Sequence, residues 1–394
     1  MHAQPLTRRS TIWLVLLLVL GSVPALAAPP KSILDDPAFQ EDALQGLDRL
    51  YTLDLAGASA TFSRISARYP DHPVGPLLKA LPAWWEIQLN PEDESLDEAF
   101  LDAMGEVLKR SDRRLKRNRN DLDAMFFKAG AHAFRGRLHA DRKHYLRAAR
   151  DGQKALKYFQ EVRKRDPDNP DLLLGAGLFD YLADVVPDQY PILKPFARLF
   201  PRGDKARGLR ELQEAMDKGR YVSTEASFSL LQIYYFFEKD YATSLHYARQ
   251  LRERYPGNSL FHLYEGRAFA RLNLWGEARR VLGEVAEKQA EGQPGYTGNV
   301  AEPAFYLLGR DGVKGKRYAE ALEVLERLEE LPRNGRKEST YKVYGRLYRG
   351  MALDAMGQRQ EALRWYQQVL SARGSANDKA RDQARGYLRQ PFLG

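Results

Sequence analysis

The sequence predicts an all-α protein, namely an α-solenoid of stacked helix-turn-helix repeats that follows an N-terminal signal peptide. From residue 40 onward, apolar residues recur with the period of a helix, and no convincing alternating strand pattern interrupts them. Short turns rich in Pro, Asn, Asp and Gly separate the amphipathic stretches, and proline in such a turn prevents the preceding helix from continuing. Four of these turns contain Pro70, Pro167, Pro256 and Pro332.

Length and composition limit the classes of protein that fit. The chain has 394 residues, 44% hydrophobic and 29% charged, which suits either two or three domains or one elongated repeat array. Both charge signs are well represented, with 61 Lys and Arg against 52 Asp and Glu, so wholesale disorder is excluded. The chain contains no cysteine, which excludes disulfides, zinc-thiolate sites, iron–sulfur clusters and a thiol nucleophile.

The first residues have the pattern of an export signal. Arg8 and Arg9 precede the apolar run Ile12–Leu20, and Ala25-Leu26-Ala27 has the small-x-small form of a signal-peptidase site. The apolar run is about half of the ~20 residues that a membrane-spanning helix needs. We therefore predict a signal peptide over 1–27 and a linker over 28–39. The predicted location is the periplasm or another exported compartment, and the alternative is an uncleaved signal that anchors the protein in the inner membrane.

The remaining chain divides into three predicted regions. These are divergent helical repeats over 40–220 with an insert near 187–203, regular repeats over 221–373, and a C-terminal helix or tail over 374–394. In the first helix of the divergent region, Leu44, Leu47, Leu50 and Tyr51 are expected on one apolar face. In the regular region, small and aromatic residues recur at the spacing of a 34-residue helical hairpin. The small residues are expected where two helices cross closely, because a larger side chain would force the helices apart. The recurring residues are Phe228, Leu231 and Tyr235; Gly266, Phe269 and Ala278; Phe305, Leu308, Gly309 and Ala321; Gly350, Leu353, Ala362 and Tyr366. In these positions the chain resembles tetratricopeptide-repeat (TPR) proteins.

A second resemblance lies across the insert. The segments 177–182, 203–204 and 208–212, with Pro187 between the first two, resemble the TPR family of eukaryotic inclusion-body clearance proteins (TPR-39-like) and their bacterial relatives. The resemblance covers roughly 121–260 and implies an α-solenoid adaptor with no active-site residues to carry over. The predicted signal peptide departs from the eukaryotic members, which act inside the cell, so we do not transfer their cellular role.

The sequence offers little support for catalysis, and we predict no enzyme, cofactor or metal. His132, His139 and His144 lack the spacing of metal ligands on one helix face and are expected on the helix surface. Asp180 and Asp184 lie four residues apart and would serve acid–base chemistry if they were buried together. Carboxylates in this setting more often cap a helix or pair with an arginine such as Arg207. A hydrolase-type site at the two aspartates is therefore the least favoured hypothesis.

The favoured hypothesis is a non-enzymatic scaffold that binds a protein or peptide partner of the cell envelope in a concave groove. Aromatic residues recur on the first helices of the repeats, among them Trp84 and Trp85. Adjacent aromatics cannot all face one way on a helix, so we expect one of such a pair in the core and its neighbour in the groove. Tyr234, Tyr235 and Arg267 are the predicted groove residues, because Tyr and Arg are enriched at binding surfaces.

The alternative hypothesis involves a basic region. Residues 109–165 hold 19 Lys and Arg against six acids, after an acidic stretch. These bases either form a solvated segment paired with the acidic helix, or they bind anionic lipid or lipopolysaccharide. The candidate binding residues are Arg110, Arg113, Arg114 and Arg117. No nucleic-acid-binding motif is present.

Overall fold

The structure is a computed structural model that describes residues 32–189, 194, 201–332, 339–374 and 377–394. The predicted signal peptide over 1–27 lies outside the described residues, as does most of the insert 187–203. The described residues form seventeen α-helices and contain no strand, which confirms the all-α prediction. Within these residues, no helix is both long enough and apolar enough to cross a membrane.

The helices and their bounds, in chain order, are η1 (Ile33–Asp35), α1 (Pro37–Tyr51), α2 (Leu55–Arg68), α3 (Val74–Leu89), α4 (Asp97–Arg117), α5 (Leu122–Asp141), α6 (Tyr145–Arg165), α7 (Leu172–Gln189), α9 (Lys205–Lys218), α10 (Ser223–Ile233), η3 (Tyr234–Glu238), α11 (Tyr241–Arg254), α12 (Ser259–Arg271), α13 (Trp275–Ala290), α14 (Gly298–Lys314), α15 (Tyr318–Glu330), α16 (Thr340–Ala355), α17 (Arg359–Ser371) and α18 (Asp378–Arg389). The predicted linker 28–39 therefore includes η1 and the start of α1.

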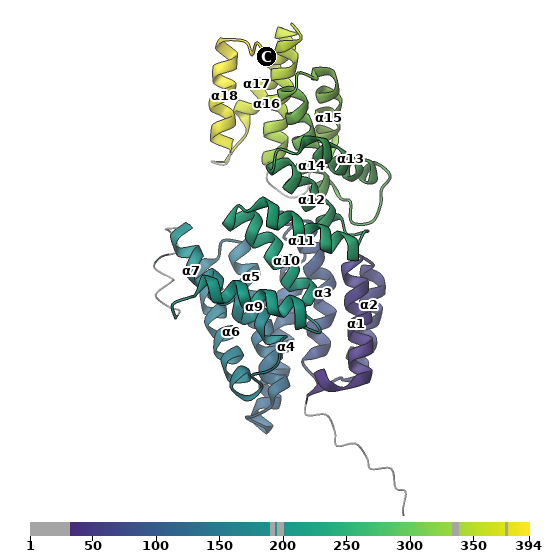
Figure 1. The fold of residues 1–394 in the computed structure, drawn as a ribbon, viewed down its shortest axis with the longest axis vertical. Coiled ribbons are helices and arrows are strands. Elements are labelled where there is room, and N and C mark those ends of the chain that lie inside the picture. Colours follow the sequence, from purple (N-terminus) through teal and green to yellow (C-terminus); the bar gives the residue numbers. More distant parts are fainter. Residues whose placement is uncertain (1–31, 190–193, 195–200, 333–338, 375–376) are drawn as a thin grey trace, which may run out of the picture.

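Consecutive helices pack as hairpins, and the hairpins follow one another along an elongated molecule (Figure 1). The pairs are α1/α2, α3/α4, α5/α6, α7/α9, α10/α11, α12/α13, α14/α15 and α16/α17, and α18 packs on the last pair. Helices α1 to α11 form a broad body, and α12 to α18 form a narrower column above it. The helices α2, α6, α11 and α15 end just before the four turn prolines, as the sequence predicts.

The turns inside five of the eight hairpins named above share one backbone geometry. Residues Leu53, Lys143, Asn273, Lys316 and Gly357 have left-handed conformations, with φ between 59° and 79°. In each of these turns, the backbone N–H of the left-handed residue donates a hydrogen bond to the carbonyl three residues earlier. The backbone N–H of the following residue donates to the carbonyl five residues before itself. These two bonds satisfy carbonyls that the helix end leaves free. The first hairpin therefore belongs to the same series as the last, although its sequence pattern is weaker.

Small residues occur where the two helices of a hairpin cross. A Cβ atom on Gly266, Gly309 or Gly350 would lie 2.4–2.5 Å from the buried side chain of Leu282, Leu325 or Tyr366, respectively. This confirms the predicted reason for glycine at these repeat positions. Gly46 has the same role against Phe62 in the first hairpin, at 2.3 Å.

The glycines of the second resemblance allow two backbones to touch. A Cβ atom on Gly208 in α9 would lie 2.7 Å from the carbonyl oxygen of Gly177 in α7. A Cβ atom on Gly203 would lie 2.4 Å from the carbonyl oxygen of Asp180. The motif thus specifies a close α7–α9 crossing, which is a packing role.

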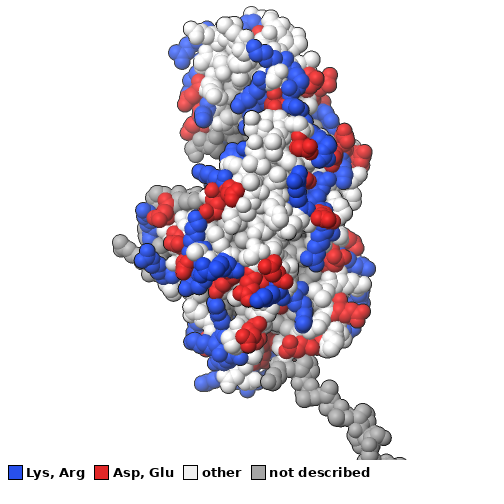
Figure 2. All heavy atoms as spheres, in the orientation of Figure 1, with Lys and Arg blue, Asp and Glu red and all other residues white. Residues whose placement is uncertain are grey.

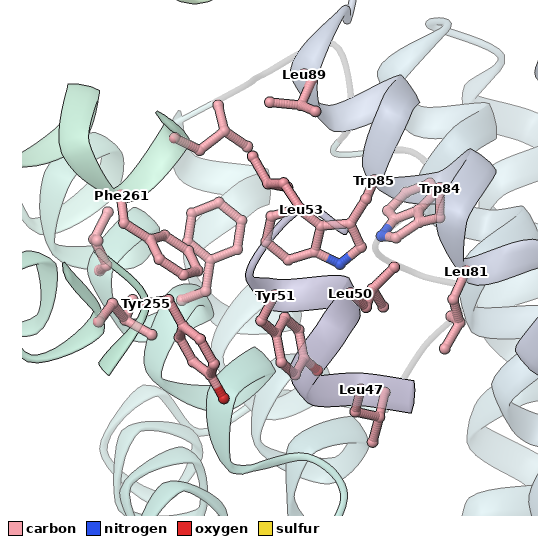
Figure 3. Packing of buried hydrophobic residues seen from close by; sticks show 14 of the residues in the cluster. Leu47, Leu50, Tyr51, Leu53, Leu81, Trp84, Trp85, Leu89, Tyr255 and Phe261 are labelled. Atoms are coloured by element: carbon pink, nitrogen blue, oxygen red, sulfur yellow. The ribbon is translucent and has the colours of Figure 1, made fainter. Parts of the chain in front are cut away.

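The N-terminal hairpins pack against the middle of the chain, which the repeat pattern did not predict. Tyr51 and Trp85 point toward Tyr255 and Phe261 in one continuous apolar cluster (Figure 3). The Trp85 ring lies 5.9 Å from that of Phe261, and Asn258 donates a hydrogen bond to the carbonyl of Tyr51 at 2.8 Å. These contacts join the first two hairpins to the segment that connects α11 and α12 and to α12 itself.

Two expectations about single residues in this half are also corrected. Trp84 and Trp85 were expected to divide between the core and the groove, but both are buried. Trp84 stacks on Phe100 at 5.3 Å, because α3 is enclosed by neighbouring helices on both sides. Leu44 was expected on the apolar face of the first helix, but its side chain is 40% exposed.

Candidate binding face

The first helices of the last hairpins contact one another and present tyrosine and arginine side chains. Helix α14 packs on both α12 and α16, and rings of α10 and η3 contact Tyr264 of α12. We call the shared surface the aromatic–arginine face. It consists of Tyr235, Phe236, Tyr264, Arg267, Tyr306, Arg310, Tyr341, Tyr344 and Tyr348. Phe236 is exposed, Tyr235 and Tyr264 are buried beneath it, and the other members are half-buried.

Arg267 lies at the centre of an aromatic cage. Its guanidinium carbon is 4.8 Å from the ring centre of Tyr235 and 5.1 Å from that of Tyr264. Among the described residues, no carboxylate oxygen lies within 4 Å of this guanidinium. Burial raises the pKa of the Tyr264 phenol, so this ring stays neutral and does not compensate the arginine charge. Arg267 is therefore a half-buried cation held by ring faces.

A π-helical turn brings two consecutive aromatics to the same cation. The segment η3 (Tyr234–Glu238) is wider than an α-helix and ends at Lys239, whose φ is 56°. Tyr235 and Phe236 consequently both contact Arg267, and Phe236 is 46% exposed. Adjacent aromatic side chains point in different directions on an α-helix. In this π-helical turn, however, both rings reach the same cation.

Tyr234, Tyr235 and Arg267 were predicted together from the sequence, and the structure separates them. Tyr235 and Arg267 are in contact. Tyr234 instead stacks on Tyr247 of α11, with ring centres 5.9 Å apart, and does not reach the cage. Phe236 was not predicted. It stands in a run of four aromatic residues, and the sequence does not show which of the four contact the arginine.

A second arginine without a carboxylate lies on the next first helix. The guanidinium carbon of Arg310 is 5.6 Å from the Trp275 ring and 5.7 Å from the Tyr306 ring. Its Nε is buried and has no hydrogen-bond partner within the described part of the chain. Tyr306 also contacts Tyr341 and Tyr348 of α16. Burial raises the pKa of Tyr348 to about 12, so this phenol is neutral as well.

Sequence reasoning missed Tyr306, Arg310 and the α16 tyrosines. A usable signal exists, because Tyr264 precedes Arg267 by three residues and Tyr306 precedes Arg310 by four. Both spacings place the pair on one face of a helix.

The predicted basic residues divide into two groups. Arg110 donates to the carbonyl of Pro70 at 2.6 Å, and the Nε of Arg114 lies 2.8 Å from Asp121. Both therefore support the fold. Arg113 and Arg117 are exposed and have no ion pair within the described residues. The four arginines lie in the second half of α4, which ends at Arg117.

The expectation of surface histidines is wrong for two of the three. His132 and His139 are buried and both face Asp151 of α6, at 2.7 Å and 3.7 Å. The Nε of Arg135 lies 3.3 Å from the same carboxylate. Burial would raise the pKa of Asp151, but His132 and Arg135 lower it overall. No cluster in the described part of the chain combines three or more residues suited to holding a metal ion.

Asp180 and Asp184 do not form a catalytic pair. Asp180 accepts two hydrogen bonds from Arg207, at 2.5 Å and 2.7 Å. Asp184 accepts one from the backbone N–H of Lys205, at the start of α9, at 3.0 Å. Both carboxylates thus have the structural roles that the sequence favoured.

Comparison with known proteins identifies the repeat type. The family model described as tetratricopeptide repeat matches residues 233–294. These residues include η3, Tyr264 and Arg267. Residues 233–294 therefore match a tetratricopeptide repeat. No protein of curated function matches the sequence.

Several solved structures are similar to the chain at low identity. The human IFIT1 dimer with m7Gppp-AAAA has a TM-score of 0.45 and 12% identity, covering 90% of this chain and 88% of that one. Yeast Tom70 has a TM-score of 0.31 and 13% identity, covering 90% and 89%. The C-terminal part of a TPR-containing protein from Cytophaga hutchinsonii has a TM-score of 0.27 and 14% identity, covering 86% and 98%. The resemblance to inclusion-body clearance proteins stays a prediction.

Proposed function

We propose that this protein is a non-enzymatic scaffold whose aromatic–arginine face binds an extended segment of a partner protein. The observation that carries the proposal is the cage of Arg267, a cation without a carboxylate partner beside the half-exposed ring of Phe236. A partner carboxylate would form charge-assisted hydrogen bonds with the guanidinium. An apolar partner side chain would cover Phe236. Arg310 offers a second cation of the same kind on the next first helix.

We further propose that the protein acts after export, so that its partner belongs to the cell envelope. The N-terminal pattern of residues 1–27 supports this location. N-terminal sequencing of the protein from the extracytoplasmic fraction tests it. Cleavage after Ala27 is the expected result, and recovery of the intact N-terminus in the membrane fraction would favour the anchored form.

Selection from a displayed random-peptide library tests the binding proposal without a known partner. The purified full chain is expected to enrich peptides that carry a carboxylate next to an apolar residue. Arg267→Ala is expected to weaken binding of these peptides by ≥ 2 kcal/mol, about 30-fold, as at a typical hot spot. Arg364→Ala is the matched control, because Arg364 is exposed on α17 and has no ion pair within the described residues.

Two further results decide the outcome. Arg267→Lys is expected to bind nearly as poorly as Arg267→Ala, because an ammonium does not reproduce the planar, stacked guanidinium. Enriched peptides that bind the wild type, Arg267→Ala and Arg364→Ala equally would refute the proposed face. Circular dichroism melting of each variant separates loss of binding from loss of fold.

A further inference from the structure

A strip of basic residues runs along the outer side of α6, away from the aromatic–arginine face. Arg147, Arg150, Lys154 and Lys157 follow one another at intervals of three or four residues, so they lie on one face of the helix. All four are exposed. The opposite face of α6 buries Ala149, Asp151, Ala155 and Val162 against the rest of the protein. We call these four cations the α6 strip.

The residues of the α6 strip have no acidic partners, in contrast to several bases nearby. Arg142 pairs with Asp97, and Lys128 pairs with Asp112. Among the described residues, no carboxylate oxygen lies within 4 Å of the cation of any strip residue. Lys and Arg side chains gather along the lower left edge of the molecule in Figure 2, where Figure 1 places α6. The strip therefore presents its full positive charge to solvent.

A cavity continues the strip at its C-terminal end. It has a volume of about 280 Å³ and lies between the end of α4, the start of α5, and α6. Leu115, Met125 and Tyr158 line it with apolar surface, and the exposed cations Arg119 and Lys157 stand at its rim. The one carboxylate that lines it, Glu161, is already bonded to Lys164 and Arg165. Cations above an apolar floor suit an amphiphilic anion.

We propose that the α6 strip and this cavity dock the protein onto an anionic lipid bilayer. A helix side of four cations over 11 residues extends about 17 Å, long enough to contact several lipid headgroups at once. Leu146 flanks the strip and is 47% exposed, so it can enter the interfacial region of the bilayer. The contact is electrostatic, and each cation near an anionic bilayer contributes roughly a 5-fold gain in binding.

The surroundings of the strip favour a bilayer over nucleic acid. Proteins that hold single-stranded nucleic acid present free aromatic faces on which bases stack. The aromatic ring at this surface, Tyr158, is occupied by the ammonium groups of Lys128 and Lys157, at 4.5 Å and 5.8 Å from its centre. Leu146 would have no role against a phosphate backbone, whereas it has one at a lipid interface.

Vesicle sedimentation with the full chain tests the proposal. The vesicles are phosphatidylcholine alone, or phosphatidylcholine and phosphatidylglycerol in a roughly 2:1 ratio. Arg150→Gln/Lys154→Gln is expected to reduce binding to the anionic vesicles roughly 25-fold. The control Arg364→Gln/Lys379→Gln removes the same charge from exposed positions on α17 and α18. The apolar segment Ile12–Leu20 is present in every variant, so it does not account for a difference between them.

The outcomes separate the possible ligands. Binding that requires phosphatidylglycerol, is lost at about 0.5 M salt and is weakened by the strip variant but not by the control supports the proposal. Equal loss in both variants would show that net charge alone acts, and overturns it. A single-stranded RNA that binds the wild type more tightly than the vesicles do, and loses binding in the strip variant, would assign the strip to nucleic acid instead.

Discussion

Substituting Gly266 by alanine is expected to destabilise the repeat region, although alanine is the better helix former. The new Cβ would lie 2.5 Å from Cδ2 and 2.8 Å from Cγ of Leu282, and 3.3 Å from Val281. Leu282 is fully buried, so it cannot turn out of the way without disturbing the core. Overpacking of this kind costs about 1–3 kcal/mol, and the helix preference of alanine returns at most about 1 kcal/mol. The expected net loss is about 1–2 kcal/mol.

The neighbouring helix provides a matched control. Gly283 lies inside α13, and a Cβ atom there would meet nothing within 4 Å. Gly283→Ala is therefore expected to stabilise the protein by about 0.5–1 kcal/mol. Urea denaturation followed by far-UV circular dichroism measures both changes, and hydrogen exchange of α12 and α13 shows whether they are local. If both substitutions shift the midpoint in the same direction, the helix crossing does not explain the glycine.

Three further predictions concern stability. Burial lowers the pKa of His139 below 6.5. As the pH falls past that value, the unfolded chain binds more protons than the folded protein, so the free energy of unfolding decreases. His139→Gln should flatten this decrease in midpoints measured between about pH 7 and about pH 5, and an unchanged slope would contradict the prediction. Asp123→Ala should cost about 2–4 kcal/mol in urea denaturation, because the buried carboxylate accepts from the N–H of Ile33 and faces His72 at 3.3 Å; a loss under about 0.5 kcal/mol would argue against this network. Lys143→Gly should raise the melting temperature slightly, gaining about 0.5–1 kcal/mol, since Lys143 has a φ of 61°; a lower melting temperature would show that the lysine side chain matters.

The local features of the fold could be predicted from the sequence because they depend on neighbouring residues. Proline cannot continue a helix, so Pro256 marks the end of α11 correctly. Gly309 marks a helix crossing for a similarly local reason. The packing of Tyr51 on Tyr255 could not be predicted in this way. This contact depends on the rotation of each hairpin relative to the one before it, added up over several hairpins. A repeat pattern in the sequence does not specify that total rotation.

The candidate face could be predicted in part. Arg267 was predicted because Tyr and Arg on a first helix indicate a binding surface, and the structure places it against Tyr235. Tyr234 was placed wrongly because η3 is a π-helical turn, and the run of aromatics there does not reveal the change of register. His132 and His139 were assigned to the surface because their partner, Asp151, lies on the next helix. A pattern of charges along one helix does not show which residues of the second helix lie opposite it in the hairpin.

The two proposed surfaces should act independently, because they share no residues and no helix. The aromatic–arginine face lies on η3, α12, α14 and α16, and the α6 strip lies on a different hairpin. Sites that share no contacts are expected to show a coupling free energy within about 0.5 kcal/mol of zero. A selected peptide should therefore bind with the same affinity in the presence of anionic and neutral vesicles, and Arg150→Gln/Lys154→Gln should leave peptide binding unchanged. A several-fold change in peptide affinity on anionic vesicles would show that the bilayer contact reaches the aromatic–arginine face, and the separation of the two surfaces would then be wrong.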